Sequence, residues 1–138
     1  MKKIVITGGA GFIGSWVLRE LFLRYKDAEF AIIDNLCCGS SKTIERYIAT
    51  DRVILYEVDL KNIDKIQHIF KDATDVYHFA ANADIAKATT NPTVDFYEGT
   101  LLTQNVIESA RVSNIKNFIY ASGSGVYGEK KLLSISED

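Results

Sequence analysis

The sequence contains few of the residues that mark specialised classes of protein. Its 138 residues include one proline, one tryptophan, two histidines and two cysteines. The cysteines are adjacent, at Cys37 and Cys38, where a disulfide would be strained and where two ligands are too few for a metal site. We therefore expect reduced thiols in a cytoplasmic protein, without a metal ion.

Long apolar runs and an excess of charge are also missing. No run approaches the roughly 18 apolar residues that cross a bilayer, and the run after Lys2-Lys3 is too short for the core of a signal peptide. Sixteen basic and 18 acidic residues give a net charge of −2, which argues against nucleic acid or a membrane surface as the main partner. The length suits one domain over residues 1–138.

The pattern of apolar residues predicts an α/β fold. Runs suited to buried parallel strands occur at 3–7, 29–34, 52–58, 75–80 and 117–122, with helical patterns between them. Right-handed crossovers would place these five strands in a doubly wound, Rossmann-like parallel sheet of order 3-2-1-4-5. The ligand site should then lie at the carboxyl ends of the first and fourth strands, where the winding reverses.

The helical patterns predict which residues face the sheet. The first helix would bury Ile13, Trp16, Val17 and Leu21, and a short helix would occupy 41–49. A third helix would bury Ile63, Ile66 and Phe70, with Asn62 or Asp59 as its cap. The longest helix would start after Asn91-Pro92 and run to about Val112, with an inward stripe of Leu102, Val106, Ile107 and Ala110.

The glycine-rich segment that follows the first strand is the strongest motif. Gly8 permits a tight turn, Gly11 lets the backbone approach a pyrophosphate, and Gly14 lets the helix pack closely on the strand. The same spacing is satisfied by a second frame that begins at Gly9. In either frame, phosphates would sit on the N–H groups at the start of the helix.

An acidic residue at the end of the second strand supports a dinucleotide. Asp34 stands 20 residues after Gly14, where a carboxylate accepts hydrogen bonds from the adenosine ribose. No basic residue between 34 and 41 is available for a 2′-phosphate. We therefore expect NAD rather than NADP.

Several further motifs occur in one order along the chain: TGGAGFIGS, IIDNL, Asp59-Leu60, His78-Phe79-Ala80-Ala81, Gly99-Thr100, and Tyr120-Ala121-Ser122 through Val126-Tyr127-Gly128. With these motifs the chain resembles the N-terminal part of the extended short-chain dehydrogenase/reductase family, in the branch of NAD-dependent nucleotide-sugar epimerases and dehydratases. The resemblance covers essentially the whole sequence.

The resemblance implies a set of cofactor contacts. They comprise Gly8, Gly11, Phe12, Ile13, Gly14, Asp34, Asn35, Asp59, Leu60, Phe79, Ala80 and Ala81. Asp59 would hydrogen-bond the exocyclic amine of adenine, although a helix cap is an alternative role. We expect His78 to be a hydrogen-bonded core residue and His68 to be solvated. Phe96 replaces an asparagine that the family commonly places three residues before its Gly-Thr pair.

The same resemblance implies where the catalytic hydroxyl lies. The family usually has Ser or Thr three residues before the valine of its Val-Tyr-Gly signature, and this chain has Gly123 there. Ser122 or Ser124 must then supply the hydroxyl that bonds the sugar. We favour Ser124, because flanking glycines give the loop freedom to re-aim it.

The family's general base is the tyrosine of a helical Tyr-x-x-x-Lys motif. Tyr127 and Lys131 match formally, but Gly128 disfavours the helix that would place both on one face. We reject this pair and expect the true motif beyond Asp138, so that the domain is truncated at its C-terminal end. The resemblance implies the cofactor-binding half of a UDP-hexose 4-epimerase, homodimeric in its full-length form. A non-catalytic NAD-binding module is the alternative.

Overall fold

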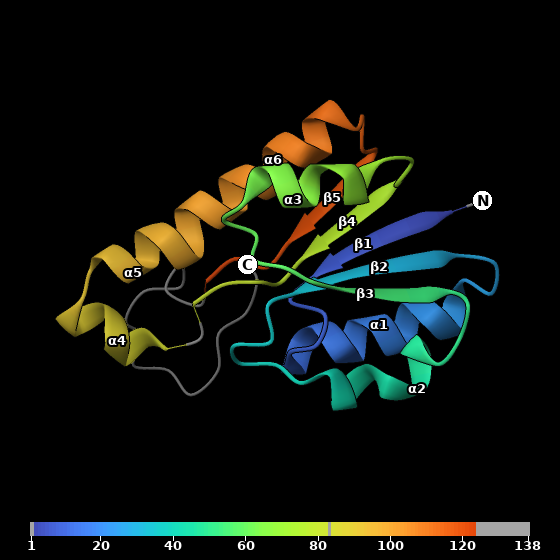
Figure 1. Cartoon of the computed structure of the whole chain (residues 1–138), viewed down its shortest axis with the longest axis horizontal. Helices are drawn as coiled ribbons and strands as arrows, with labels where there is room; N and C mark the ends of the chain where they lie inside the picture. The colour runs from blue at the N-terminus through green and yellow to red at the C-terminus, as the bar shows by residue number, and fades with distance from the viewer. Residues whose placement is uncertain (1, 83, 124–138) are drawn as a thin grey trace, which may run out of the picture.

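The computed structural model describes residues 2–82 and 84–123, and its centre is a parallel sheet with helices on both faces (Figure 1). Over these residues five strands pair in the order β3-β2-β1-β4-β5, which confirms the predicted topology. The strands are β1 (Lys3–Thr7), β2 (Glu29–Asp34), β3 (Val53–Glu57), β4 (Asp75–His78) and β5 (Asn117–Tyr120). All pairings are parallel, so every carboxyl end meets the same edge of the sheet.

The helical segments include two departures from the prediction. They are α1 (Phe12–Arg24), η1 (Ser41–Ile44), α2 (Glu45–Ile48), α3 (Ile63–Ile66), η2 (Gln67–Phe70), α4 (Ile85–Thr90), α5 (Thr93–Asp95), η3 (Phe96–Leu101) and α6 (Leu102–Val112). The expected long helix contains a π-helical segment, η3. The sequence pattern gave no indication of α4, which is capped by Asp84. None of these described helices is both long and apolar enough to cross a membrane.

Two hydrophobic cores cover the two faces of the sheet. Alternate residues of β1 point to opposite faces, as the pleat requires, so Val5 joins one core while Ile4 and Ile6 join the other. The first core packs the sheet against α3, η2 and α6, and the second packs it against α1 and α2. Figure 1 shows these helices above and below the sheet.

The buried faces of α1 and α6 correct two predictions. Ile13 and Trp16 were expected to be buried, yet they are 57% and 52% exposed. Leu21 is buried as predicted, but the rest of the buried face of α1 is Gly14, Ser15 and Leu18, because the close contact of Gly14 with the turn after β1 sets the rotation of the helix. In α6, Leu102, Val106 and Ala110 are buried as predicted, but Ile107 is 44% exposed.

Candidate functional site

A cavity of about 380 Å³ opens at the carboxyl ends of β1, β2, β3 and β4. Every residue that the sequence nominated for cofactor contact lines it. The remaining lining residues are Ile33, Cys37, Cys38, Gly39, Val58, Glu98 and Leu102. The cavity therefore forms where the winding of the sheet reverses, at the edge predicted from the strand order.

The turn after β1 accepts only glycine at two positions. Gly8 has φ of +67°, and a Cβ there would lie 2.7 Å from the backbone nitrogen of Ala80. A Cβ on Gly14 would lie 2.2 Å from the carbonyl oxygen of Gly8. Gly9 differs, since its Cβ would meet the side chain of Ile32 at 2.6 Å. Of the two glycine frames, the structure thus supports Gly8/Gly11/Gly14, whose glycines form the turn and the contact with the helix. Gly9 instead packs against the side chain of Ile32.

The N-terminus of α1 lies at this cavity without a side-chain cap. Gly11 is the N-cap residue, and the first turn contains no acidic residue. The first N–H groups of a helix have no partner within it, and the helix dipole places partial positive charge there. Phe12, 82% exposed, and Ile13 extend beside these donors. The helix end can therefore receive an anionic group such as a phosphate.

Asp34 ties the end of β2 to the glycine turn. Its side chain is buried, and its Oδ2 accepts a hydrogen bond from the N–H of Ala10 at 2.9 Å. Its Oδ1 accepts a hydrogen bond from the N–H of Leu36, also at 2.9 Å. An ionised carboxylate offers about four acceptor positions, so both oxygens retain capacity for a ribose hydroxyl.

Gly39 is a site residue that the sequence reasoning missed. A Cβ on Gly39 would lie 2.9 Å from the carbonyl carbon and oxygen of Ala10. The N–H of Ser40 also donates to the Ala10 carbonyl, at 3.3 Å. The loop after β2 therefore packs directly on the glycine turn. A glycine shortly after the acidic end of a strand was the available signal.

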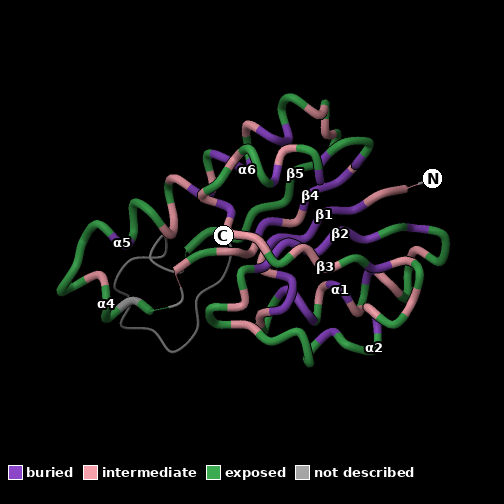
Figure 2. Tube along the Cα trace, in the orientation of Figure 1, coloured by how far each residue is buried: buried purple, intermediate pink, exposed green. Residues whose placement is uncertain are grey.

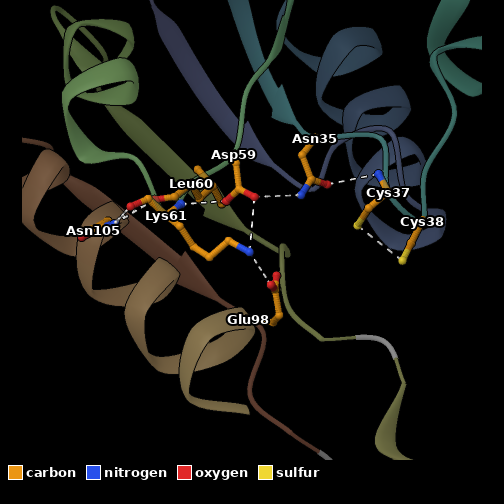
Figure 3. Close-up of polar contacts among 8 residues, drawn as sticks. All are labelled: Asn35, Cys37, Cys38, Asp59, Leu60, Lys61, Glu98 and Asn105. Carbon is orange, nitrogen blue, oxygen red and sulfur yellow. Dashed lines mark hydrogen bonds and ion pairs between the residues drawn. The ribbon is translucent and has the colours of Figure 1, made fainter. Parts of the chain in front are cut away.

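A chain of polar contacts crosses one side of the cavity (Figure 3). Asp59 accepts hydrogen bonds from the Lys61 N–H at 2.9 Å and from the Asn35 amide at 3.4 Å, and its carboxylate pairs with the Lys61 ammonium at 3.4 Å. The same ammonium donates to Glu98. Burial by itself raises the pKa of Asp59, but the contacts with Lys61 and Asn35 outweigh it and lower that pKa. The hydrogen bond to Glu98 raises the pKa of Lys61.

These contacts place the Asp59 carboxylate on the cavity and away from the cap of α3. Asn62 caps that helix, accepting a hydrogen bond from the N–H of Lys65 at 3.3 Å. Of the two caps that the sequence left open, the structure selects Asn62. Asp59 is thereby available for a ligand in the cavity.

Asn105 of α6 positions the segment that follows β3. Its buried amide donates to the carbonyls of Leu60 and Lys61, at 2.9 and 3.0 Å. Asn105 is not among the residues predicted from the sequence, although a polar residue three positions after Leu102, among the inward positions of an amphipathic helix, is a usable signal. The amide holds the segment at Leu60 and Lys61 from the side of α6 (Figure 3).

His78 holds β4 in place and carries no charge at neutral pH. It is 1% exposed, with Nδ1 2.5 Å from the Thr7 hydroxyl and Nε2 3.0 Å from the Thr103 hydroxyl. Burial lowers its pKa to about 4. The expectation of a hydrogen-bonded core histidine is confirmed. The Thr7 hydroxyl also accepts from the N–H of Ala80 at 3.4 Å, which steadies the cavity wall.

The predicted catalytic loop is described only at its beginning. Ser122 is exposed and follows β5, and the N–H of neighbouring Ala121 donates to the His78 carbonyl at 3.3 Å. Ser124 lies outside the described residues, as do Tyr127 and Lys131. Phe96 is 53% exposed and does not line the cavity, whereas Glu98 does.

Together, the glycine turn, the uncapped helix end and the acidic end of β2 around one cavity define an α/β domain with a Rossmann-like fold. Comparison with known proteins places it more narrowly. The chain belongs to the NAD dependent epimerase/dehydratase family, whose model matches residues 4–138. This agrees with the family inferred from the sequence motifs.

Similar proteins include several 4-epimerases. The chain is 33% identical to a UDP-glucose 4-epimerase of Haemophilus influenzae over 98% of its own length and 40% of that protein. A solved UDP-Glc/GlcNAc 4-epimerase from Campylobacter jejuni matches with a TM-score of 0.86 and 34% identity, over 99% of this chain and 42% of that one. UDP-glucose 4-epimerase from Thermus thermophilus, solved in complex with NAD, matches with a TM-score of 0.84 and 30% identity, over the same shares.

Proposed function

We propose that these residues form the NAD-binding part of a nucleotide-sugar epimerase of the UDP-hexose 4-epimerase type. The observation that carries the proposal is the backbone cradle formed by the uncapped N-terminus of α1 and the turn before it, which lines the cavity. Gly8 and Gly14 hold the cradle in shape, because a Cβ on either would collide with backbone of the chain itself. Such a cradle fits a pyrophosphate, whose oxygens need close backbone donors and no intervening side chain. The chain spans 40% of the length of the UDP-glucose 4-epimerases of Haemophilus influenzae and Pasteurella multocida, and their activity is proposed for the protein on that basis.

Each part of the cavity would hold one part of the cofactor. The α1 N-terminus would bind the pyrophosphate, Asp34 the adenosine ribose, and Asp59 with Leu60 the adenine. Phe79, Ala80 and Ala81 would lie against the rest of the dinucleotide. When bound, NAD supplies a reversible hydride acceptor for oxidation of a sugar hydroxyl.

The acidic character of the cavity supports NAD over NADP. Asp34, Asp59 and Glu98 line it, and Lys61 already pairs with the latter two. A 2′-phosphate would therefore meet repulsion at Asp34, while ribose hydroxyls would find acceptors. We expect NAD to bind about tenfold or more tightly than NADP, a difference of about 1.4 kcal/mol or more. Titration calorimetry with both nucleotides tests this, and equal affinities would contradict it.

A glycine substitution tests the cradle. A Cβ on Gly11 would meet only the Gly8 carbonyl, at 3.2 Å, so Gly11→Ala should fold while placing a methyl group beside the phosphates. We expect it to weaken NAD binding by about tenfold. Gly99→Ala is the matched control, since nothing lies within 4 Å of its Cβ position. Unchanged NAD affinity in Gly11→Ala would place the cofactor elsewhere.

The sugar-binding hydroxyl is proposed at Ser124, with Ser122 as the alternative. Parallel pairing brings the end of β5 to the edge of the sheet that holds the cavity, so both serines follow a strand aimed at the site. In a form that includes the family's Tyr-x-x-x-Lys motif, Ser124→Ala should lower turnover about a hundredfold and Ser122→Ala much less. The reverse order would assign the role to Ser122.

The non-catalytic alternative is tested on the 138 residues themselves. With NAD and UDP-galactose, we expect no UDP-glucose to form, because no described or nominated group takes the proton of the sugar hydroxyl. Turnover that Tyr127→Phe abolishes would instead make Tyr127 and Lys131 the catalytic pair. A homodimeric full-length protein is part of the same proposal, and light scattering measures it.

A further inference from the structure

Cys37 and Cys38 present two thiols side by side at the mouth of the cavity (Figure 3). Their Sγ atoms lie 3.5 Å apart, and both residues are exposed. They are the only cysteines of the 138 residues. Any reaction that needs two thiols of this chain must therefore use this pair.

The loop that bears the thiols is held at both ends. The N–H of Cys37 donates to the Asn35 side chain at 3.1 Å, and Leu36, with φ of +57°, donates its N–H to Asp34. On the other side Gly39 and Ser40 contact Ala10 of the glycine turn. The two sulfur atoms are thus presented from a braced segment, which lowers the conformational cost of binding one ligand with both.

The separation of the sulfurs favours chelation over a disulfide. A disulfide needs about 2.05 Å between sulfurs and Cα atoms about 4.4–6.8 Å apart, whereas consecutive Cα atoms are about 3.8 Å apart. Two sulfurs bound at about 2.3 Å to one centre lie about 3.3–3.8 Å apart for angles at that centre of about 90–110°, a range that includes the 3.5 Å found here. Within residues 2–82 and 84–123 no group of three or more His, Cys, Asp or Glu side chains is placed to hold a metal ion. The atom best suited to this pair is therefore one that needs only two protein ligands, both of them sulfur.

We propose that Cys37 and Cys38 form a vicinal dithiol site for monosubstituted trivalent arsenicals, and that an occupied site competes with NAD. The competition rests on the proposed cofactor site, whereas the capture itself does not. In the reaction both S–H bonds and both arsenic–oxygen bonds of an R–As=O group break, and two arsenic–sulfur bonds form. The oxygen leaves with the two thiol protons as water, and arsenic remains trivalent.

The raised pKa of the Cys37 thiol suits this condensation. Burial raises the pKa of Cys37, and so do the neighbouring Cys38 thiol and the negative charges of Asp34 and Glu98. A raised pKa disfavours the thiolate that simple alkylation requires. The condensation consumes two thiol protons, so a second thiol within reach matters more than a free thiolate. The need for a second thiol distinguishes dithiol capture from the alkylation of a single exposed cysteine.

Phenylarsine oxide is the probe for the capture step. Intact mass spectrometry of the 138-residue chain should show one adduct with loss of both free thiols, stable in excess glutathione and removed by dithiothreitol. Because the second sulfur binds intramolecularly, Cys37→Ser and Cys38→Ser should each lose the adduct to glutathione about a hundredfold faster. Equal retention by either variant would overturn the proposal. The absence of an adduct on the wild-type chain would also overturn the proposal. Labelling with N-ethylmaleimide reports separately whether the thiols are accessible, and neither result of that labelling would rescue the proposal.

Competition with the cofactor is measured separately. Saturating NAD should slow adduct formation about tenfold, and the preformed adduct should weaken NAD binding about tenfold in calorimetry. Gly11→Ala, at the same NAD concentration, should lose the protection and keep the adduct. NAD binding without protection would overturn the competition. Failure of NAD to bind at all would refute the cofactor site, while the adduct would still report on the dithiol.

Discussion

Residues 2–82 and residues 84–123 build their shares of the fold by different means. In the first region β1 and β2 are almost wholly buried, and the turns pack backbone against backbone at Gly8, Gly14 and Gly39. In the second region every residue of β5 is exposed, and Figure 2 shows α4 and α5 largely exposed as well. The cradle is therefore fixed by steric exclusion. The second region is joined to the first by the pairing of β5 with β4, by the apolar face of α6 and by single side-chain contacts.

Glycine-to-alanine substitutions should separate the two regions most strongly. Gly14→Ala forces a Cβ to 2.2 Å from the Gly8 carbonyl oxygen and 2.7 Å from the Gly9 Cα, with backbone on both sides. We expect a loss of about 4 kcal/mol or more in the free energy of unfolding. Gly99→Ala in the second region should be neutral or stabilising by about 0.5–1 kcal/mol. Urea unfolding measures both, and similar losses would show that exclusion does not distinguish the regions.

Acidification tests the contact at which the regions meet. His78 of β4 bonds Thr7 in one region and Thr103 in the other, and burial lowers its pKa to about 4. Since the unfolded chain binds a proton below about 6.5 and the folded chain does not, stability is complete above 6.5. It should fall as the pH drops toward 4, by up to about 3 kcal/mol.

The variant His78→Gln isolates this effect. Urea unfolding between pH 7.5 and 4.5 should show a steeper loss for the wild type than for the variant, each compared with its own value at pH 7.5. Parallel pH profiles would show that His78 is not the group that titrates. Asp75 does not obscure this window: burial by itself raises its pKa, but bonds from Thr74, Asn117 and Lys2 lower it overall, so it titrates at lower pH.

A substitution at Asn105 should have a smaller effect on stability, confined to one contact between the regions. Asn105→Ala leaves the carbonyls of Leu60 and Lys61 without their side-chain donor. We expect a loss of about 1–2 kcal/mol in unfolding free energy, with a less firmly held segment at Leu60 and Lys61 beside the cavity. Gln104→Ala, on the exposed side of the same helix, should change stability by less than about 0.5 kcal/mol. Equal losses in the two variants would reflect helix propensity alone.

The smallest effect is expected at the ion pairs of Lys61. The ammonium, with a side chain 32% exposed, joins Asp59 in one region to Glu98 in the other. Lys61→Met should cost less than about 1 kcal/mol, because partly exposed pairs are weak. The pKa of Asp59 should nevertheless rise, since the variant removes an attractive charge and leaves the burial. Carboxyl NMR titration detects this shift, and an unmoved pKa would exclude Lys61 as its cause.

The contrast between the regions also explains what the sequence could predict. Strand order and the place of the cavity follow from local patterns, namely apolar runs and a glycine spacing with an acidic residue at a set distance. Other lining residues, such as Asp59, Leu60 and Phe79, were predicted from the family resemblance. The orientation of α1 could not be predicted from local patterns, because the contact of Gly14 with Gly8 overrides the apolar stripe through Ile13 and Trp16. Three further contacts join residues far apart in the sequence, and nothing local indicates them: Asn105 with Leu60, Gly39 with Ala10, and the Lys61 ammonium with Glu98.

Asp34 has a consequence for any attempt to redesign the cofactor preference. The carboxylate that would repel a 2′-phosphate is also the acceptor for the Ala10 and Leu36 N–H groups. Replacing it with a small neutral residue would release both donors while it opens room for the phosphate. Selectivity and scaffolding are thus encoded in one side chain. An engineer who wants an NADP-accepting variant would have to transplant the loop after β2 and the glycine turn as a matched pair.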